Sequence, residues 1–336
     1  MKLSRCSKAL HTLESYVTTE KQTASDEGGP KLSITLKKFL VATDGSDDTA
    51  LATRAAIDLS NETSAELHVV HAWRVPPTPS LAQPGLAYPS QEAIDQLEAC
   101  EKEAEELLEK QAERIRATGG TLAQTHLRDG RAAEEISALA EELGVDLLVV
   151  GSRGVGTVER LITGSVSEGI VHLADCPVLV VRGGEGAWPP STVILGDDFS
   201  NEAGQAGELA AMVSRLFGAR MLCVWVYSMT LSGARRASHV MRAEEVLKKG
   251  EESLEERAAE LERILGKRPN TLVTTGDAAS VVQSAAEKGG EPTLVVVGRR
   301  GLGAVKRFAL GSVSTDVLRA VSGPVMITPP LKEEPR

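Results

Sequence analysis

The stretch G-S-R-G at residues 151–154, followed nine residues later by G-S-V-S at residues 164–167, occurs twice in this chain. The second occurrence reads G-R-R-G at residues 298–301 and G-S-V-S at residues 311–314, again with nine residues between its two parts. Two independent matches to so long a pattern are not expected by chance. A repeat of this kind indicates a duplicated structural unit, and it decides the fold.

The sequence around the two motifs repeats as well. One apolar run precedes each motif, and another follows it after a helix-like stretch. Near the start of each copy an apolar run ends in an acidic residue, Asp44 or Asp198. The chain is therefore a tandem duplication. The matching runs are DLLVV at 146–150 and TLVVV at 293–297, CPVLVV at 176–181 and GPVMI at 323–327, and FLVATD at 39–44 and TVILGDD at 192–198.

The duplication divides the 336 residues into two predicted domains. Domain one spans residues 37–182 and domain two spans residues 191–329. Residues 183–190, which are rich in glycine and proline, form the linker between them. Residues 1–33 match neither copy, and their polar composition predicts a mobile tail.

Domain one also contains an insertion. From Asp44 to Gly151 the numbering advances by 107, and from Asp198 to Gly298 by 100, so domain one holds seven extra residues. They fall in the proline-rich loop at 76–89, which is either a lid over a site in domain one or a passive surface insertion. We favour the passive insertion.

Short apolar runs alternate with longer helical patterns inside domain one. Strands that are buried on both faces contain continuous runs of Val, Leu and Ile, which are typical of a parallel sheet covered by helices. The pattern therefore predicts an α/β protein with two tandem, doubly wound domains. The predicted strands are 38–43, 65–73, 121–127, 146–150 and 178–182, and the predicted helices are 47–61, 90–117, 131–143 and 165–174.

Composition and charge exclude several classes of protein. The chain has 37 Lys and Arg residues and 47 Asp and Glu residues, which gives a net charge of −10. It also has only three Trp, three Tyr and four Phe. Because nucleic-acid binding uses positive charge and aromatic stacking, we do not expect this protein to bind nucleic acid. No apolar run approaches the roughly 20 residues that cross a bilayer, and no apolar segment follows the basic N-terminal residues, so we expect neither membrane association nor secretion. The four cysteines lie far apart, which favours a reducing compartment and a cytoplasmic location.

The carboxyl ends of the first and fourth strands are where an open α/β sheet binds its ligands. Glycines at this edge let main-chain N–H groups approach a phosphate, and the G-S-V-S tetrad begins a helix whose unpaired N–H groups attract anions. The serines of the tetrad add hydroxyl donors or help to cap the helix. In the alternative interpretation, the glycines only shape turns and allow close packing. Duplication of the whole pattern after a buried strand favours a nucleotide site.

Charged residues at the same edge each allow two interpretations. Asp44 and Asp198 could hydrogen-bond a ribose or an adenine or help to hold a cation. Equally, each could form an Asx turn or a helix cap, and the two roles are compatible. Arg153, Arg299 and Arg300 could reach phosphates, although solvent-exposed arginines are the favoured alternative.

The sequence offers no evident metal site or catalytic apparatus. His68 and His71 lie three positions apart on a strand and point to opposite faces, which disfavours zinc, and no partner is evident for His126. Neither the phosphate loop G-x-x-x-x-G-K-[ST] nor the G-x-S-x-G elbow is present, and no nucleophile is matched with a base and its orienting residue. We therefore expect a binding protein and not an enzyme.

The doubled motif resembles the signature of the universal stress protein family, G-x-x-G, nine residues, G-[ST]. The resemblance covers about residues 37–182 and 191–329, as in a tandem member of the family. It implies a five-stranded parallel sheet flanked by helices in each domain, the adenine-nucleotide alpha hydrolase-like fold, and ATP binding. By position, it implies that Asp44 and Ala72, and Asp198 and Val226, contact the adenosine. It also implies that the phosphates are lined by Gly151, Arg153, Gly154, Gly164, Ser165, Val166 and Ser167 in domain one and by Gly298, Arg300, Gly301, Gly311, Ser312, Val313 and Ser314 in domain two.

The resemblance also implies a cofactor and partners. ATP would be bound with Mg²⁺, for which the sequence has no dedicated set of ligands. Members of the family dimerise through their last strands. Here residues 178–181 and 325–327 could pair within one chain as an intramolecular pseudo-dimer, and whole chains could dimerise further. Because Asp197 beside Asp198 adds negative charge near a polyphosphate, we expect weaker nucleotide binding in domain two.

Three functions are compatible with these features of the sequence. We expect an ATP-binding stress-response protein, in which nucleotide occupancy sets a conformation that an unidentified protein partner recognises and hydrolysis is slow. The alternative is a nucleotide-independent scaffold that uses the same fold. An adenylating enzyme is disfavoured, because ATDGSD at residues 42–47 does not match the S-G-G-x-D-S loop that such enzymes carry after the first strand.

Overall fold

The computed structural model describes residues 36–74, 91–152, 164–228, 237–290, 292–301 and 310–329. The described residues form two compact units, 36–181 and 182–329, called domain one and domain two below. The predicted tail, the proline-rich loop at 76–89, Arg153 and Gly154 lie outside the described residues, so what was predicted for them stays a prediction.

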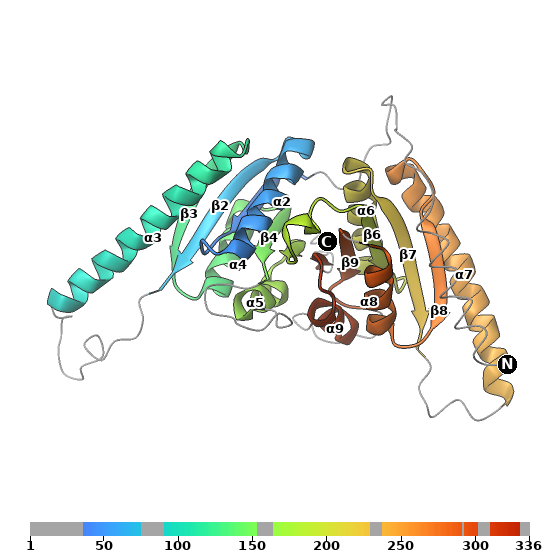
Figure 1. Ribbon diagram of the computed structural model, residues 1–336. Coiled ribbons are helices and arrows are strands. Elements are labelled where there is room, and N and C mark those ends of the chain that lie inside the picture. Colours follow the sequence, from blue (N-terminus) through green and yellow to red (C-terminus); the bar gives the residue numbers. More distant parts are fainter. Residues whose placement is uncertain are drawn as a thin grey trace, which may run out of the picture. The chain divides into compact units, whose positions relative to one another are not determined.

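Domain one contains a parallel sheet with helices on both faces (Figure 1). Its five described strands have the order β3-β2-β1-β4-β5. The order reverses between β1 and β4, which is where an open sheet leaves room for a ligand at its carboxyl edge. The elements are β1 (Lys38–Ala42), α2 (Asp47–Thr63), β2 (Glu66–Trp73), α3 (Gln91–Ala117), β3 (Leu122–Asp129), α4 (Ala132–Leu143), β4 (Leu147–Gly151), α5 (Ser165–Leu173) and β5 (Val178–Val181).

Domain two repeats this arrangement. Its five described strands have the order β8-β7-β6-β9-β10, which reverses between β6 and β9. A single 3-10 turn, η2 (Glu185–Ala187), precedes the first strand. The remaining elements are β6 (Thr192–Gly196), α6 (Asn201–Leu216), β7 (Arg220–Tyr227), α7 (Ala237–Leu265), β8 (Asn270–Thr275), α8 (Ala278–Lys288), β9 (Thr293–Gly298), α9 (Ser312–Ala320) and β10 (Val325–Thr328).

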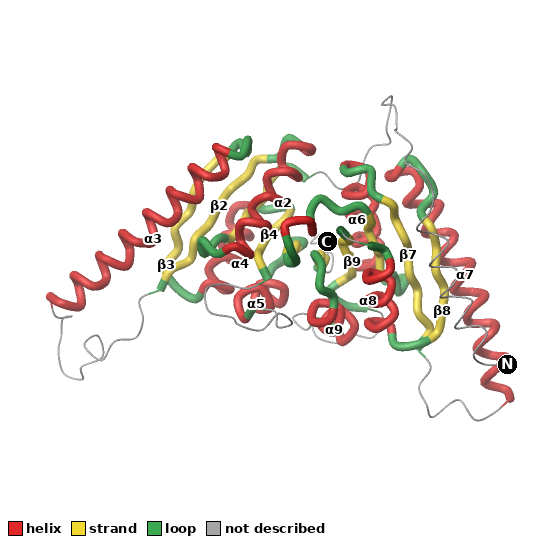
Figure 2. Tube along the Cα trace, viewed as in Figure 1, coloured by secondary structure: helices red, strands yellow, loops and turns green. Residues whose placement is uncertain are grey.

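Helices cover each sheet in two pairs. In domain one, α2 and α3 pack together against one face, and α4 and α5 pack together against the other. In domain two the corresponding pairs are α6 with α7 and α8 with α9, and α7 runs alongside β7 and β8 (Figure 2). The central strands are buried on both faces, as Phe39, Leu40 and Val41 of β1 show. This burial is the physical reason for the continuous apolar runs in the sequence.

The predicted fold class is confirmed, and each predicted element of domain one is present. Their ends differ by one or two residues. For example, the helix predicted at 47–61 extends to Thr63, because the chain leaves α2 only at Ser64, whose left-handed backbone (φ 57°) lets its N–H return to the Ser60 carbonyl. Such a cap depends on backbone geometry that the apolar pattern does not contain.

Candidate functional site

A pocket of about 470 Å³ opens at the carboxyl edge of the domain-two sheet, where the strand order reverses. Residues at the ends of β6, β7 and β9 and the first turn of α9 line it. The apolar side chains of Val224, Ala278, Val282 and Val297 contribute to its wall. The structure brings together in this pocket all nine site residues predicted for domain two: Asp198, Val226, Gly298, Arg300, Gly301, Gly311, Ser312, Val313 and Ser314.

Asp198 forms the turn that leads from β6 into α6. Its Oδ1 accepts a hydrogen bond from the Ser200 N–H at 3.1 Å, and in domain one Asp44 Oδ1 accepts from the Ser46 N–H at 3.0 Å. The Asx turn, one of the two interpretations that the sequence allowed, is therefore present at both aspartates. The other carboxylate oxygen of Asp198 lies next to Gly301, so it faces the glycine turn and the pocket.

The glycine turn after β9 requires residues without side chains. A Cβ on Gly301 would collide with Asp198 Oδ2, and a Cβ on Gly298 would lie 3.0 Å from the Cβ of Glu202 on α6. The two ends of the turn are also tied together, because the Gly311 N–H donates to the Arg299 carbonyl at 2.8 Å. Close approach of the turn to the β6–α6 loop therefore explains the glycines at 298 and 301.

Helix α9 presents main-chain donors to the pocket. Its N-cap is Gly311, which has no side chain to accept from the first turn, and the first intrahelical bond runs from the Thr315 N–H to the Gly311 carbonyl at 2.9 Å. The N–H groups of Ser312, Val313 and Ser314 precede that bond and carry the positive end of the helix dipole. Val313 is 41% exposed although it is apolar, and it lines the pocket. This helix end has the chemistry of an anion site.

The serines of the tetrad divide into two kinds. Ser314 is buried, and its hydroxyl donates to the Gly298 carbonyl at 2.7 Å. Ser167 does the same in domain one, to the Ser152 and Gly164 carbonyls at 3.1 and 3.0 Å. Ser165 and Ser312 are exposed. The second serine of each tetrad therefore holds the glycine turn against the helix, while the first is open to solvent.

The two described arginines of the turn are not solvent-exposed, so the alternative favoured from the sequence is wrong for both. Arg299 is only 3% exposed. Arg300 lines the pocket, and its Nη2 lies 3.7 Å from Glu202 Oε1 on α6, with 12% of its side chain exposed. The carboxylate of Glu202 and the wall of the pocket keep Arg300 turned inward, where a guanidinium can bind phosphate oxygens.

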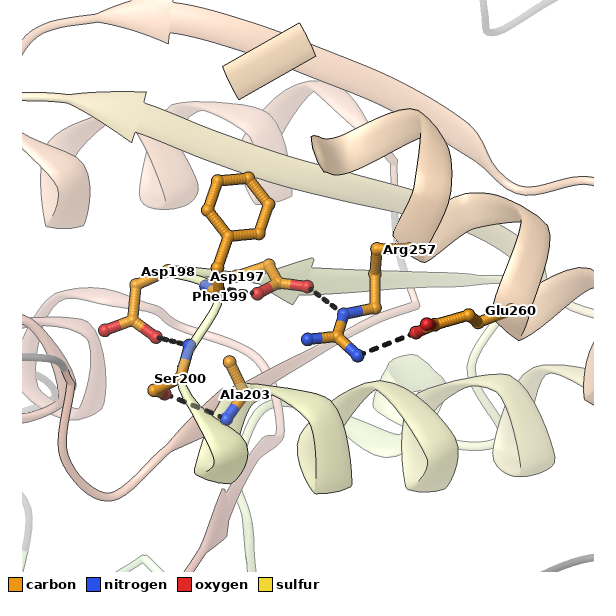
Figure 3. Close-up of polar contacts among 7 residues, drawn as sticks. All are labelled: Asp197, Asp198, Phe199, Ser200, Ala203, Arg257 and Glu260. Atoms are coloured by element: carbon orange, nitrogen blue, oxygen red, sulfur yellow. Dashed lines mark hydrogen bonds and ion pairs between the residues drawn. The ribbon is translucent and has the colours of Figure 1, made fainter. Parts of the chain in front are cut away.

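Asp197 points away from Asp198, toward helix α7 (Figure 3). It borders the pocket, but its side chain is fully buried: Oδ2 accepts from Arg257 Nε at 3.0 Å and Oδ1 accepts from the Phe199 N–H at 2.7 Å. Burial raises the pKa of the Asp197 carboxyl, and Arg257 and the Phe199 N–H oppose that rise. The sequence predicts added negative charge at Asp197 near a polyphosphate; in the structure that carboxylate pairs with Arg257, which also pairs with Glu260 at 2.9 Å. Weaker nucleotide binding in domain two stays a prediction.

The described part of domain one repeats this geometry. Gly164 is the N-cap of α5, the Glu168 N–H donates to its carbonyl at 3.0 Å, and Val166 is 42% exposed. Gly151 ends β4, and Ala72 lies near the end of β2, half-buried. Arg153 and Gly154 lie outside the described residues.

The histidines of domain one have partners that the sequence did not show. His68 Nδ1 lies 3.0 Å from His126 Nε2 across β2 and β3, and His71 Nδ1 lies 2.8 Å from the Thr43 carbonyl. Over the described part of the chain, no three His, Cys, Asp or Glu residues come close enough to hold a metal ion. Nor does any helix of that part combine the length and the apolar character of a membrane span.

Comparison with known proteins decides the family. The model of the universal stress protein family matches residues 35–182 and again residues 191–329. The chain belongs to the universal stress protein family. Its two matches are two universal stress protein domains in tandem, as the duplicated motif predicted.

Two relatives from Bacillus subtilis and Methanocaldococcus jannaschii each match about one domain's length, and a solved structure matches most of the chain. Universal stress protein YxiE of Bacillus subtilis is 40% identical over 146 residues, which cover 43% of this chain and 98% of YxiE. Universal stress protein MJ0531 of Methanocaldococcus jannaschii is 35% identical over 146 residues, 44% of this chain and 82% of MJ0531. The crystal structure of a universal stress protein from Archaeoglobus fulgidus has a TM-score of 0.61 at 21% identity and covers 87% of this chain and 98% of its own. That structure supports the fold.

Three residues of this universal stress protein site were missed in the sequence. Glu202 contacts Arg300, Arg257 contacts Asp197, and Trp225 lines the pocket while stacking on Phe199 at 5.6 Å between ring centroids. Trp225 is the residue before the predicted Val226, so the same strand end could have indicated it. Arg257 follows Asp197 by 60 residues and lies on a different element, helix α7, so no local signal identified it.

Proposed function

We propose that each domain binds ATP together with Mg²⁺ and that nucleotide occupancy acts as a conformational signal in a stress response. The observation that carries the proposal is the domain-two pocket, in which the nine predicted residues from four separate segments meet around the donor-rich end of α9. Its volume of about 470 Å³ lies within the range of ordinary small-molecule sites.

Different parts of the pocket suit different parts of a nucleotide. The N–H groups at the start of α9 and the guanidinium of Arg300 are suited to phosphate oxygens. The apolar residues Val224 and Val226 suit the adenine ring, and the carboxylate of Asp198 suits the hydroxyl groups of a ribose. The phosphates would lie against the glycine turn, whose surface an added Cβ would obstruct.

Mg²⁺ would bind through the nucleotide. Magnesium keeps several of its waters and takes few protein ligands beyond the phosphate oxygens, so a dedicated carboxylate cluster is not required. The donor set of the pocket therefore fits a magnesium nucleotide. We expect little or slow hydrolysis, because none of the described residues that line the pocket is a lysine or a histidine that could act on a phosphate or a water.

A nucleotide-independent scaffold is the second candidate. It is favoured by the internal hydrogen bonds of Asp198 and Ser314, which show that both residues also serve the architecture. The two candidates differ in whether purified protein carries or takes up adenine nucleotide.

The test is to denature the purified chain, identify any released nucleotide, and titrate the nucleotide-free protein with MgATP by calorimetry. We expect two sites for the wild type, one for Gly154→Val, one for Gly301→Val and none for the double variant. If the wild type takes up no ATP in either domain, the scaffold function replaces this proposal.

Partners and location form the remaining part of the proposal. We propose a cytoplasmic protein that signals to a protein partner of unknown identity. Pairing of residues 178–181 with 325–327 within one chain, and dimerisation of whole chains, remain predictions, and sedimentation analysis with and without MgATP would test the latter.

A further inference from the structure

Corresponding positions of the two domains can be matched through strand register. The Thr43 N–H donates to the Val70 carbonyl, and the Asp197 N–H donates to the Val224 carbonyl, both at 2.9 Å. Asp197 therefore corresponds to Thr43. Val70 pairs with His126 and Val224 pairs with Leu272. Counting back fifteen residues from each gives Gln111 on α3 and Arg257 on α7.

The buried faces of the two helices confirm this match. Leu108, Ala112 and Ile115 of α3 are buried, and the residues at the same offsets in α7 are Leu254, Ala258 and Leu261, which are buried too. Gln111 and Arg257 thus occupy one position above the sheet. Domain one has the neutral residues Thr43 and Gln111 at these two positions, and domain two has the ion pair Asp197 and Arg257.

The two domains also differ at a third position, two residues after Thr43 and Asp197. Gly45 of domain one has φ 79°, and its counterpart Phe199 has φ 64°, a left-handed conformation that is unusual for an aromatic residue. The Phe199 ring stacks on Trp225, and Trp225 packs against Gly250 of α7, where a Cβ would collide with the indole. In domain two the loop between β6 and α6 is therefore attached to α7 by an ion pair and by an aromatic stack.

Asp197 links the contacts with α7 to the pocket residue Asp198, which follows it in the chain. The Asp197 carboxylate accepts from Arg257 Nε and from the Phe199 N–H, and the Asp198 carboxylate turns the opposite way (Figure 3). The Asp198 carboxylate lies next to Gly301. Asp197 and Asp198 are adjacent, so a backbone change that moves one carboxylate also moves the other. A buried charge that loses its partner is strongly unfavourable, which favours loop conformations that expose the Asp197 carboxylate to solvent.

We propose that Arg257 is a positioning residue of the domain-two nucleotide site, which holds the β6–α6 loop through Asp197 and thereby keeps Asp198 turned into the pocket. The inference rests on the proposed function of that pocket. Binding in domain two then depends on α7, and domain one, with its neutral pair, has no such ionic attachment.

The test uses the full chain with Gly154→Val as the parent, so that only domain two binds. Arg257→Gln is expected to weaken binding of ATP, ADP, AMP and adenosine by about the same factor, roughly tenfold or more, because Asp198 acts on the nucleoside that all four share. Asp197→Thr/Arg257→Gln installs the pair that domain one uses and is expected to restore binding to within about threefold of the parent. Arg268→Gln is the matched control, since Arg268 pairs with Glu255 and Glu262 on the exposed side of α7.

Three results would overturn the inference: unchanged binding by Arg257→Gln, a loss that grows with the number of phosphates, or a double variant as weak as the single one. Amide hydrogen exchange of the nucleotide-free protein gives an independent measurement, and Arg257→Gln should speed exchange at Phe199 and Ser200. If the parent binds no nucleotide, the proposed function fails, while the exchange result still decides whether Arg257 holds the loop.

Discussion

The imidazole rings of His68 on β2 and His126 on β3 are stacked, with His68 Nδ1 3.0 Å from His126 Nε2 and 5.3 Å between the ring centroids. One nitrogen must donate and the other accept, so a proton added to both rings breaks the contact. The same register that matches the two domains gives Leu222 and Leu272 at these positions in domain two. One domain therefore carries a titratable pair where the other is apolar.

This pair predicts an acid-sensitive domain one. Burial lowers the pKa of both histidines below the ordinary 6.5; Lys38 adds to this for His68, and His68 and Arg128 add to it for His126, whereas Glu66 and Glu142 oppose it. The folded state therefore binds fewer protons than the unfolded chain below about pH 6.5, and stability falls as the pH falls through that window.

The variant His68→Leu/His126→Leu should remove this part of the pH dependence. Urea unfolding of the full chain at about pH 7.5 and about pH 5.5 measures it, with Trp73 as the probe and with Trp188 and Trp225 replaced by Phe. His71→Leu is the control, because its ring contacts the Thr43 carbonyl instead. An equal loss of stability on acidification in the wild type and the double variant would contradict the prediction.

Gly301→Val should abolish nucleotide binding in domain two and leave domain one intact. The new Cβ would collide with Asp198 Oδ2, so either the turn or the aspartate must move out of the pocket. Calorimetric stoichiometry should fall from two to one. Gly186→Val is a matched control, because a Cβ there meets no atom within 4 Å. Two sites of full affinity in Gly301→Val would show that the turn does not bind the ligand.

Trp225 should report occupancy of domain two. Trp225 lines the pocket, and its indole stacks on Phe199 and on Tyr227, the latter at 6.3 Å between centroids. In the Gly154→Val background, MgATP should change the tryptophan emission, and Trp225→Phe should remove that change. Trp188→Phe should retain it, because Trp188 packs against Phe217 and does not line the pocket. A change that survives in Trp225→Phe would contradict this assignment.

Ser314→Ala should destabilise domain two, because the buried hydroxyl donates to the Gly298 carbonyl at 2.7 Å. Loss of a buried hydrogen bond that leaves its acceptor unsatisfied costs about 1–3 kcal/mol. Ser312→Ala removes an exposed hydroxyl from the same turn and should change stability by less than about 0.5 kcal/mol. Urea unfolding of the two variants checks the difference, and equal stabilities would show that the Ser314 bond does not stabilise the turn.

The sequence predicted those site residues that lie close together along the chain. Gly298, Gly301, Gly311 and Ser314 lie within one short motif, and the motif is duplicated, so their meeting at the end of a buried strand was predictable. Asp198 could be placed at the same edge because it follows a strand. Whether its carboxylate formed a turn or faced a ligand could not be decided, since both need the same residue in the same place.

The sequence by itself determined the tandem duplication, the parallel α/β fold and the edge at which the motif residues gather. These features follow from the spacing and the apolar pattern of residues that are close in the sequence, and a strand that is buried on both faces requires a continuous apolar run. Only the tertiary structure decided that Asp197 pairs with Arg257, that Arg300 is turned inward beside Glu202, and that His68 meets His126. These contacts join residues 58 to 98 positions apart on different elements, and charge compensation in a folded protein depends on distance in space.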